Sequence, residues 1–156
     1  MDKINSTSRL PSIDSLVILT QTDTTVGFLS QDETKLQTIK QRPSNKPFIK
    51  VYKDFKILKS QLRIPNSQKS SLRRAKKTTF IVKNIAFRVA IDNLNSTLLR
   101  KVRWNYSTSA NESAKSFNRE FCEEKADIIV EDKNSLFEGQ SSKLYKINSK
   151  KKVRLR

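Results

Sequence analysis

Residues 15–20, Ser-Leu-Val-Ile-Leu-Thr, place four apolar side chains on consecutive positions. Successive side chains of a β-strand point to opposite faces of its sheet, so an unbroken apolar run is typical of a strand buried on both faces. Sheets of this kind carry helices on their faces, as in α/β proteins. The run therefore predicts that the chain folds around a central sheet of the α/β type.

Further helices and strands are expected along the chain. Asp32 is expected to cap a helix whose Leu36 and Ile39 share one face, and Pro43 is expected to end it. Strands are expected at 47–52, 78–84, 85–91, 127–132, 141–148 and 152–156, and helices at 54–62, 94–102 and 117–121. Residues 78–91 form either a hairpin or one bent strand. Residues 21–27, 64–71 and 105–113 are interpreted as polar connections.

The chain length of 156 residues suits one domain, so we expect a single α/β (α+β) domain over residues 1–156. Residues 1–14 are interpreted as a loose N-terminal lead. The mixture of strands and helices, without an internal repeat, predicts one twisted sheet flanked by helices.

The net charge is strongly positive, because 32 Lys and Arg oppose 15 Asp and Glu and leave a formal charge of +17. A body this basic attracts polyanions, so nucleotides, RNA and acidic membrane surfaces are the candidate partners. The alternative is that many of these lysines are solvated and serve no partner.

Several classes of function are disfavoured. The chain contains no His, which excludes an imidazole base and a His-based metal site, and we expect no metal centre. Its single cysteine, Cys122, is expected to pack on a helix face beside Phe121. The longest apolar run, residues 16–19, is too short to cross a bilayer, and residues 1–15 lack the apolar core of a signal peptide. We therefore expect a cytoplasmic protein without a membrane partner.

A short turn gathers positive charge between two prolines. Residues 38–48, Thr-Ile-Lys-Gln-Arg-Pro-Ser-Asn-Lys-Pro-Phe, contain Lys40, Arg42 and Lys46. Proline fixes φ, so Pro43 and Pro47 stiffen the backbone that carries these cations. Such a turn is suited to holding a phosphate group.

Arg88 has an unusual setting on its expected strand. Alternation places Phe87, Val89 and Ile91 on one face and Arg88 on the other, between Ala86 and Ala90. A guanidinium with small neighbours has room for a two-point contact with a carboxylate or phosphate. A solvent-facing arginine on an exposed sheet face remains an equal alternative.

Polar clusters also follow several expected strands. Thr24, Ser109 and Asn111 offer neutral hydrogen-bonding groups, while Lys40 and Arg42 offer charge. Ligands of open α/β sheets bind beyond the ends of strands, so this set suits a phosphate with a small polar ligand beside it. No Walker-type glycine loop is present, so side chains must hold any triphosphate.

The order of these motifs resembles that of the YrdC family, the threonylcarbamoyl-AMP synthases. The family's Pro-Thr-Asp/Glu-Thr-Val-Tyr-Gly-Leu corresponds to Gln-Thr-Asp-Thr-Thr-Val-Gly-Phe at residues 21–28. Its Lys-x-Arg-Pro and Lys-Pro correspond to residues 40–43 and 46–47, and its Val-x-Val-Arg strand to residues 85–90. The signature Thr-Ser-Ala-Asn-x-Ser is intact at 108–113, and a late Gly-x-x-Ser occupies 139–142. The chain departs from the pattern at Gln21 and Val26, and it is shorter than usual between residues 51 and 74.

The resemblance implies a twisted mixed sheet with a concave basic cleft, and it implies a nucleotidyltransferase. Such enzymes convert L-threonine, bicarbonate and ATP into threonylcarbamoyl-AMP and diphosphate, for the threonylcarbamoyladenosine modification of tRNA. ATP is then a substrate that carries Mg²⁺, and other tRNA-modification enzymes are implied partners. By matched position the implied residues are Lys40, Arg42, Ser109 and Asn111 for catalysis, these four with Lys46 and Arg156 for ATP, and Thr24, Arg88 and Ser142 for threonine. Arg154 is the alternative to Arg156.

A second interpretation stays open beside the active synthase. A catalytically weak YrdC-like module that binds tRNA or double-stranded RNA would use the basic stretch at residues 72–77, with contacts from Arg73, Arg74, Lys76 and Lys77. Few aromatic residues accompany this stretch, so base stacking is poorly supported. Solvated surface charge is the alternative for these four residues.

Overall fold

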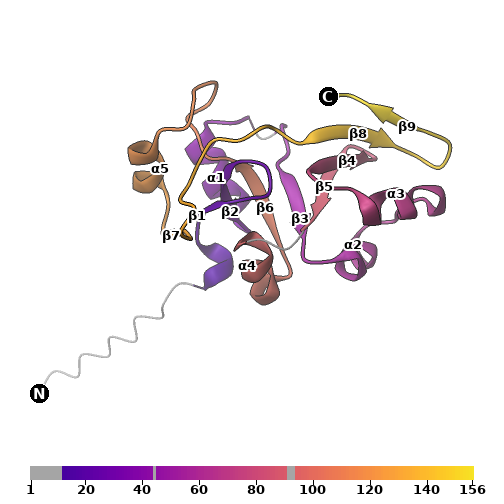
Figure 1. Ribbon diagram of the computed structural model, residues 1–156, viewed down its shortest axis with the longest axis horizontal. Coiled ribbons are helices and arrows are strands. Elements are labelled where there is room, and N and C mark those ends of the chain that lie inside the picture. Colours follow the sequence, from indigo (N-terminus) through magenta and orange to yellow (C-terminus); the bar gives the residue numbers. More distant parts are fainter. Residues whose placement is uncertain (1–11, 44, 91–93) are drawn as a thin grey trace, which may run out of the picture.

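A computed structural model describes residues 12–43, 45–90 and 94–156, with a single nine-stranded mixed sheet and five α-helices in that part of the chain (Figure 1). The order of the strands is β7-β1-β2-β6-β3-β5-β4-β8-β9. The pairs β1–β7, β3–β5 and β4–β8 are parallel, and the other neighbours are antiparallel. The strands are β1 (Ile18–Gln21), β2 (Val26–Ser30), β3 (Ile49–Tyr52), β4 (Thr78–Val82), β5 (Ile85–Val89), β6 (Trp104–Ser109), β7 (Ile128–Val130), β8 (Lys143–Ile147) and β9 (Lys152–Arg154). The expected α/β class is confirmed.

Side-chain caps fix where three of the helices begin. Asp32, Asp54 and Asn118 each accept a hydrogen bond from the backbone N–H three residues later. The cap expected at Asp32 is thus confirmed. The helices are α1 (Glu33–Lys40), α2 (Phe55–Gln61), α3 (Lys69–Arg74), α4 (Leu94–Val102) and α5 (Arg119–Lys125), with short 3₁₀ turns at Ile13–Ser15 and Asn66–Gln68. Gln41 ends α1 in the left-handed region, with φ of 48°, so the helix stops before Pro43 is reached.

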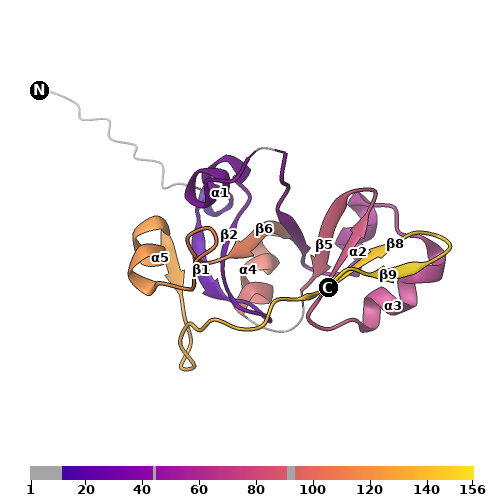
Figure 2. The same ribbon diagram turned by 90° about the horizontal axis from the view of Figure 1, so that it is seen from above.

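The buried apolar side chains of the described residues form two separate hydrophobic clusters. The helices and strands likewise form two groups, which lie on the left and right of Figure 2. We call β1, β2, β6 and β7 with α1, α4 and α5 the first half, and β3, β4, β5, β8 and β9 with α2 and α3 the second half. The cluster of the first half includes Leu19, Phe28, Leu36 and Cys122. That of the second half is centred on Leu58, Phe80 and Phe87.

Strand β1 is buried on both faces, as its sequence predicts. Leu19 belongs to the cluster that also contains Leu36 of α1, while Ile18 lines a small cavity beside Leu98 of α4. Cys122 is fully buried in the same cluster, with Phe121 packed against it, which confirms its expected place on a helix face. Burial raises the pKa of the Cys122 thiol.

Three sequence-based expectations were wrong, and all three concern polar stretches. The stretch 21–27 was expected to be a connection, but β2 begins inside it at Val26. The run 105–113 contains most of β6, a central strand, because Asn105 and Thr108 are buried despite being polar. Residues 64–71 were expected to form a loop, but α3 begins at Lys69 and Leu72 buries its apolar face. Tertiary burial overrides weak local signals in each case.

Residues 78–91 were expected to form either a hairpin or one bent strand, and the structure shows a hairpin. β4 and β5 pair in antiparallel fashion around Lys83 and Asn84, whose φ angles are 47° and 65°. Two successive residues with positive φ form the turn that matches the twist of a hairpin. The expected side-chain position of Ile91 and most of the expected N-terminal lead, residues 1–14, lie outside the described residues.

Candidate functional site

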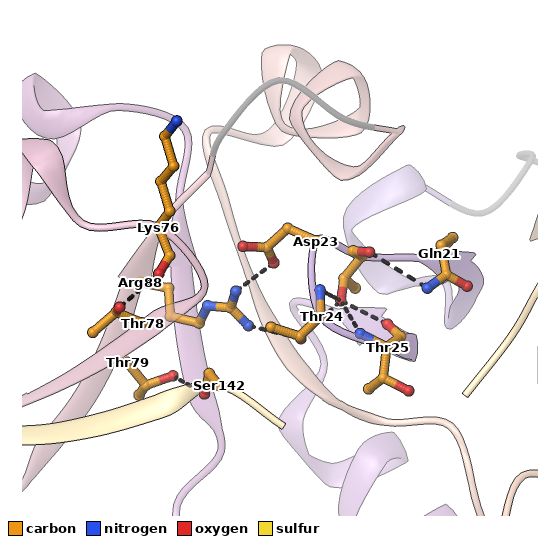
Figure 3. Close-up of polar contacts among 10 residues, drawn as sticks. Gln21, Asp23, Thr24, Thr25, Lys76, Thr78, Thr79, Arg88 and Ser142 are labelled. Carbon is orange, nitrogen blue, oxygen red and sulfur yellow. Dashed lines mark hydrogen bonds and ion pairs between the residues drawn. The ribbon is translucent and has the colours of Figure 1, made fainter. Parts of the chain in front are cut away.

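Arg88 of β5 is buried and points at a carboxylate of the other half of the molecule. Arg88 as a whole residue is 9% exposed, which excludes the alternative of a solvent-facing arginine. The guanidinium forms an ion pair with Asp23 through Nη2 and donates from Nη1 to Thr24 Oγ1 at 3.2 Å (Figure 3). The expected approach of Arg88 to Thr24 is therefore present, but the space expected around Arg88 is filled by Asp23.

Asp23 is the residue of this site that the sequence did not reveal. It follows β1 and precedes β2, in a tight connection whose centre is the Thr22 hydroxyl. Thr22 Oγ1 donates to the carbonyl of Thr25 at 2.6 Å and accepts from the backbone N–H groups of Thr24 and Thr25, both at 3.3 Å. This local bonding holds Asp23 and Thr24 side by side. The signal that could have pointed to Asp23 is the requirement of a buried arginine elsewhere in the chain for a counter-ion.

Gly139 allows a later segment to pack against the same connection. An added Cβ at Gly139 would lie 1.9 Å from the carbonyl oxygen of Thr24, which is too close for any side chain. The Gly139 N–H also donates to Thr25 Oγ1 at 3.0 Å. The glycine of the late Gly-x-x-Ser motif is therefore needed for close backbone approach to the Asp23–Thr24 connection.

Very little free space remains beside Arg88. A cavity of about 10 Å³ is lined by Asp23, Lys77 and Arg88 together with apolar and hydroxyl groups of α3, β4 and β5. A volume of this size holds at most about one water molecule. A ligand that contacts Arg88 must therefore displace the side chain of Asp23. Lys77, expected only as an RNA contact, lines this cavity.

Lys40 joins the end of α1 to the loop after β6. It is 4% exposed, and its ammonium donates to the carbonyls of Ser109 and Asn111 at 3.0 and 2.8 Å and to Asn111 Oδ1 at 2.6 Å. Ser109 Oγ donates to the same Asn111 Oδ1 at 2.8 Å. The structure thus brings together Lys40, Ser109 and Asn111 as expected. Burial, and then the charge of Arg42, lower the pKa of Lys40 to about 8.

The other two cations of the turn differ in their settings. Arg42 lies over the ring of Phe48 at 4.6 Å and donates from Nη1 to the carbonyl of Pro47 at 3.2 Å. Burial lowers the pKa of this half-buried Arg42 side chain. Lys46 is exposed, and its ammonium has no hydrogen-bond or ion-pair partner in the described part of the chain. Its backbone N–H donates to Pro43 at 3.0 Å and closes the turn.

Ser142, directly before β8, is in contact with Arg156, which follows β9. The Ser142 hydroxyl shares a 2.7 Å hydrogen bond with Thr79, which is drawn in Figure 3. Ser142 is buried. Arg156 Nε donates to the Ser142 carbonyl at 3.1 Å. Ser142 therefore keeps its hydroxyl paired within the protein, and no described hydrogen bond joins it to Arg88.

Two groups of polar residues, the Arg88–Asp23–Thr24 group and the Lys40–Ser109–Asn111 group, lie toward the same end of the sheet. Ser109 of β6 pairs in register with Gly27 of β2, three residues after Thr24. The Arg88–Asp23–Thr24 group and the Lys40–Ser109–Asn111 group are thus joined by the paired backbones of β2 and β6. No hydrogen bond or ion pair between side chains links them in the described residues.

The four cations expected to contact RNA lie on α3 and in the connection to β4. Arg73 stacks over Phe55 at 4.4 Å, and Arg74 donates to the hydroxyl of Ser70. All four, including Lys76 and Lys77, are exposed. They form no ion pair within the described ranges.

Two further properties of the described part of the chain bear on its chemistry. Within residues 12–43, 45–90 and 94–156, no cluster of three or more His, Cys, Asp or Glu side chains is arranged to hold a metal ion. None of the helices in these ranges has the length and apolar character to cross a membrane.

Sequence comparison alone identifies no relative: no protein-family model matches the chain, and no curated protein matches it. Solved structures do match its fold. P. abyssi Sua5 complexed with L-threonine aligns with a TM-score of 0.74 at 20% identity, over 90% of this chain and 50% of that one. E. coli YciO aligns with a TM-score of 0.69 at 19% identity, over 91% and 82%. Full-length HypF in a phosphate- and nucleotide-bound form aligns with a TM-score of 0.67 at 15% identity, over 90% and 26%.

These similarities establish the fold class. The chain has a YrdC-like α/β fold, shared with Sua5, YciO and HypF at low sequence identity. It spans about half the length of the Sua5 structures that it matches.

Proposed function

We propose that this chain is a threonylcarbamoyl-AMP synthase, which combines L-threonine, bicarbonate and ATP. The observation that carries the proposal is the buried guanidinium of Arg88, which already binds a carboxylate, that of Asp23, next to the Thr24 hydroxyl. A buried arginine fork that accepts one carboxylate is suited to accept another of similar geometry. The L-threonine in the Sua5 complex is a ligand with such a carboxylate.

In the proposed complex, the threonine carboxylate replaces Asp23 at Arg88. Asp23 swings out of the cavity, and the expelled charge is exchanged for an equal charge on the ligand. The free energy of the exchange is therefore small, whereas removal of Asp23 without replacement leaves a buried cation unpaired. Thr24 then offers its hydroxyl to the ligand. Ser142, paired with Thr79, supports the neighbouring wall.

ATP is proposed to bind on the other side of the strand end, at the cationic turn. Arg42 and Lys46 hold phosphates, and Arg156 reaches the nucleotide from the segment that follows β9. Lys40 has all three N–H groups bonded to the loop 109–111, so its role is to hold Ser109 and Asn111 in place toward the nucleotide. Mg²⁺ accompanies ATP as part of that substrate.

The reaction suits a site without His or a free nucleophile. Carboxylation of the threonine amine by bicarbonate forms the N–C bond of a carbamate and releases water. A carbamate oxygen then attacks the α-phosphorus of ATP, and the bond from this phosphorus to the diphosphate breaks as diphosphate leaves. The protein contributes orientation and charge stabilisation, for which fixed cations and hydroxyl groups are sufficient.

The test is ligand binding by calorimetry with the Arg88→Lys variant, followed by detection of threonylcarbamoyl-AMP. Lysine keeps the charge but loses the fork, so we expect threonine affinity to fall about 10- to 100-fold while ATP affinity is retained. Arg100→Lys, an exposed arginine on α4, is the matched control and should bind both ligands normally. Unchanged threonine affinity in Arg88→Lys, or no ATP binding by the unmodified protein, contradicts the proposal.

A second candidate function, a tRNA- or double-stranded-RNA-binding module with weak catalysis, is favoured by the exposed cluster Arg73, Arg74, Lys76 and Lys77. Reversing these four charges should flatten the salt dependence of RNA binding, because fewer counterions are released. A binding constant that does not respond to salt in the unmodified protein rejects this candidate.

A further inference from the structure

Lys77 lies next to the Arg88–Asp23 ion pair and has no partner of its own. The cavity of about 10 Å³ beside Arg88 is lined by three charged residues, Asp23, Lys77 and Arg88. Within residues 12–43, 45–90 and 94–156, the Lys77 ammonium forms no hydrogen bond or ion pair. Two cations therefore line this cavity with one carboxylate, and one positive charge is left unbalanced.

The backbone fixes Lys77 at the wall of this cavity. Its φ of 48° lies in the left-handed region, which is sterically unfavourable for a lysine. Its carbonyl accepts a hydrogen bond from the N–H of Lys143 at 3.0 Å, so β8 holds this conformation in place. The neighbouring Lys76 extends away from the Arg88–Asp23 pair in Figure 3. Residues held in unfavourable conformations by their surroundings are common at functional sites.

The carboxylate exchange proposed for threonine leaves Asp23 without its partner. The Asp23 side chain is 14% exposed, and among the described residues Arg88 is its one ion-pair partner. A ligand carboxylate at Arg88 would place two negative groups beside one cation, and their repulsion would oppose binding. A second cation close to Asp23 removes this repulsion. Among the described residues, Lys77 is the other cation that lines the cavity.

We propose that Lys77 receives the carboxylate of Asp23 when threonine binds to Arg88. The inference rests on the proposed synthase function and adds a positioning residue to it, a role separate from the RNA contact expected of the same lysine. In the free protein Asp23 pairs with Arg88. In the complex the ligand carboxylate pairs with Arg88 and Asp23 pairs with Lys77, so two cations balance two carboxylates. Without Lys77, one negative charge would remain unbalanced beside the ligand.

This role acts through Asp23, which distinguishes it from a direct contact between Lys77 and threonine. A lysine that receives the Asp23 carboxylate has no effect once that carboxylate is replaced by an amide. A lysine that binds the ligand itself has the same effect with or without Asp23. A double-mutant cycle on the two residues separates these arrangements.

The experiment measures L-threonine affinity by calorimetry in the unmodified full chain, Lys77→Met, Asp23→Asn and the double variant. Lys77→Met should lower the affinity about 3- to 5-fold, the effect of losing one partly exposed ion pair. In the Asp23→Asn background, the same substitution should change the affinity by less than about twofold, because no displaced carboxylate is present. Lys77→Arg keeps the charge and should bind threonine nearly as the unmodified protein does.

Lys83 offers a matched control. It directly follows β4, as Lys77 directly precedes it, and its φ is 47°. Both lysines are exposed, but Lys83 does not line the cavity beside Arg88. Lys83→Met should therefore leave threonine affinity unchanged. Lys77→Met should also keep the ATP affinity and the unliganded stability of the unmodified protein, because Lys77 pairs with Asp23 only in the threonine complex.

Each outcome supports or overturns the inference. Unchanged threonine affinity in Lys77→Met overturns it and leaves the proposed synthase standing. An equal loss in both Asp23 backgrounds overturns it because Lys77 then binds the ligand directly, and an equal loss in Lys83→Met overturns it because any nearby positive charge then suffices. A lower unliganded stability of Lys77→Met, measured by urea denaturation, would show a structural role instead. An unmodified protein that does not bind threonine contradicts the proposed function and the inference together.

Discussion

The two halves of the sheet treat positive charge differently. In the first half, cations lie beside acids: Lys35 is 3.9 Å from Asp127, Lys115 is 2.7 Å from Glu112, and Arg119 contacts Glu123 and Glu131. The hydrogen bonds from Arg119 help to lower the pKa of Glu131 to about 2. Residues 119–139 alone hold seven Asp and Glu.

In the second half, few acids accompany the cations. Residues 45–90 contain thirteen Lys and Arg and one acid, Asp54, which caps α2. Among the described residues, Arg88 is the one cation of this half that has a carboxylate partner, and that partner, Asp23, comes from the first half. The two halves therefore meet electrostatically at one buried ion pair, which is the place where we propose that a carboxylate ligand enters.

The largest expected effect follows from removing the acid of this pair. Asp23→Asn leaves the Arg88 guanidinium buried without a counter-ion, so the free energy of unfolding should fall by about 3–5 kcal/mol. Urea denaturation measures it. L-Threonine should restabilise Asp23→Asn more than it stabilises the unmodified protein, because the ligand then fills an empty position instead of competing for it. Glu124→Gln, at an exposed position, is the control.

An unchanged unfolding free energy in Asp23→Asn would show that Arg88 needs no partner, and the ion pair would then not connect the halves. Restabilisation by threonine that is no larger than in the unmodified protein would instead contradict carboxylate exchange.

A smaller loss is expected from Gly139→Ala. The added Cβ would lie 1.9 Å from the Thr24 carbonyl, so either the segment at 139 or the Asp23–Thr24 connection must move. Overpacking of this kind costs about 1–3 kcal/mol, measured as a shift in the urea midpoint. Gln140→Ala changes the neighbouring exposed residue and should be neutral. If Gly139→Ala is also neutral, the packing of this segment does not fix the position of Asp23.

Lys40 should give nucleotide binding a pH dependence. Below a pKa of about 8 its ammonium donates three hydrogen bonds to the loop 109–111. Above that pH the neutral amine has only two N–H donors, so one bond is lost and the loop is held less firmly. We expect ATP affinity to fall about tenfold between pH 7 and pH 9.5, the effect of one charge-assisted hydrogen bond. Calorimetry at several pH values measures it, and Lys40→Met should bind weakly at every pH. A constant affinity in the unmodified protein rejects this role for Lys40.

The sequence predicted the apolar part of this architecture better than its polar part. The buried run of β1, the Asp32 cap and the strands expected at 47–52, 78–84 and 85–91 are local signals, and the structure confirms them as β1, the α1 cap, β3, β4 and β5. β6 was missed because its buried residues are polar, although Trp104 and Tyr106 recur at the spacing of a strand. Its burial depends on neighbours β2 and β3, which are distant in sequence.

At the candidate site, too, contacts between residues distant in sequence were harder to predict than local structure. Alternation placed Arg88 on a strand and the motif order placed it near Thr24, and the contact between them is present. The occupation of that space by Asp23 depends on the folded path of residues 21–25 and on the approach of Gly139, and neither is written in a local pattern. A groove of about 860 Å³, lined by Lys59 and Lys146, joins residues from three separate segments, so no single stretch of sequence indicated it.

The smallest expected effects test whether removing a cation lowers stability in the first half and raises it in the second half. Lys35→Gln removes an exposed ion pair of the first half, whose side chains are 45% and 44% exposed, so stability should fall by less than about 1 kcal/mol. Arg63→Gln with Lys146→Gln removes two cations that have no acidic partner among the described residues, so relief of repulsion should raise the melting temperature slightly. Added salt screens both interactions, and it should therefore reduce both shifts. Melting curves at low and high salt measure this difference. A melting temperature that falls in both variants at low salt would mean that the cations of the second half are already compensated, and the proposed contrast between the halves would be wrong.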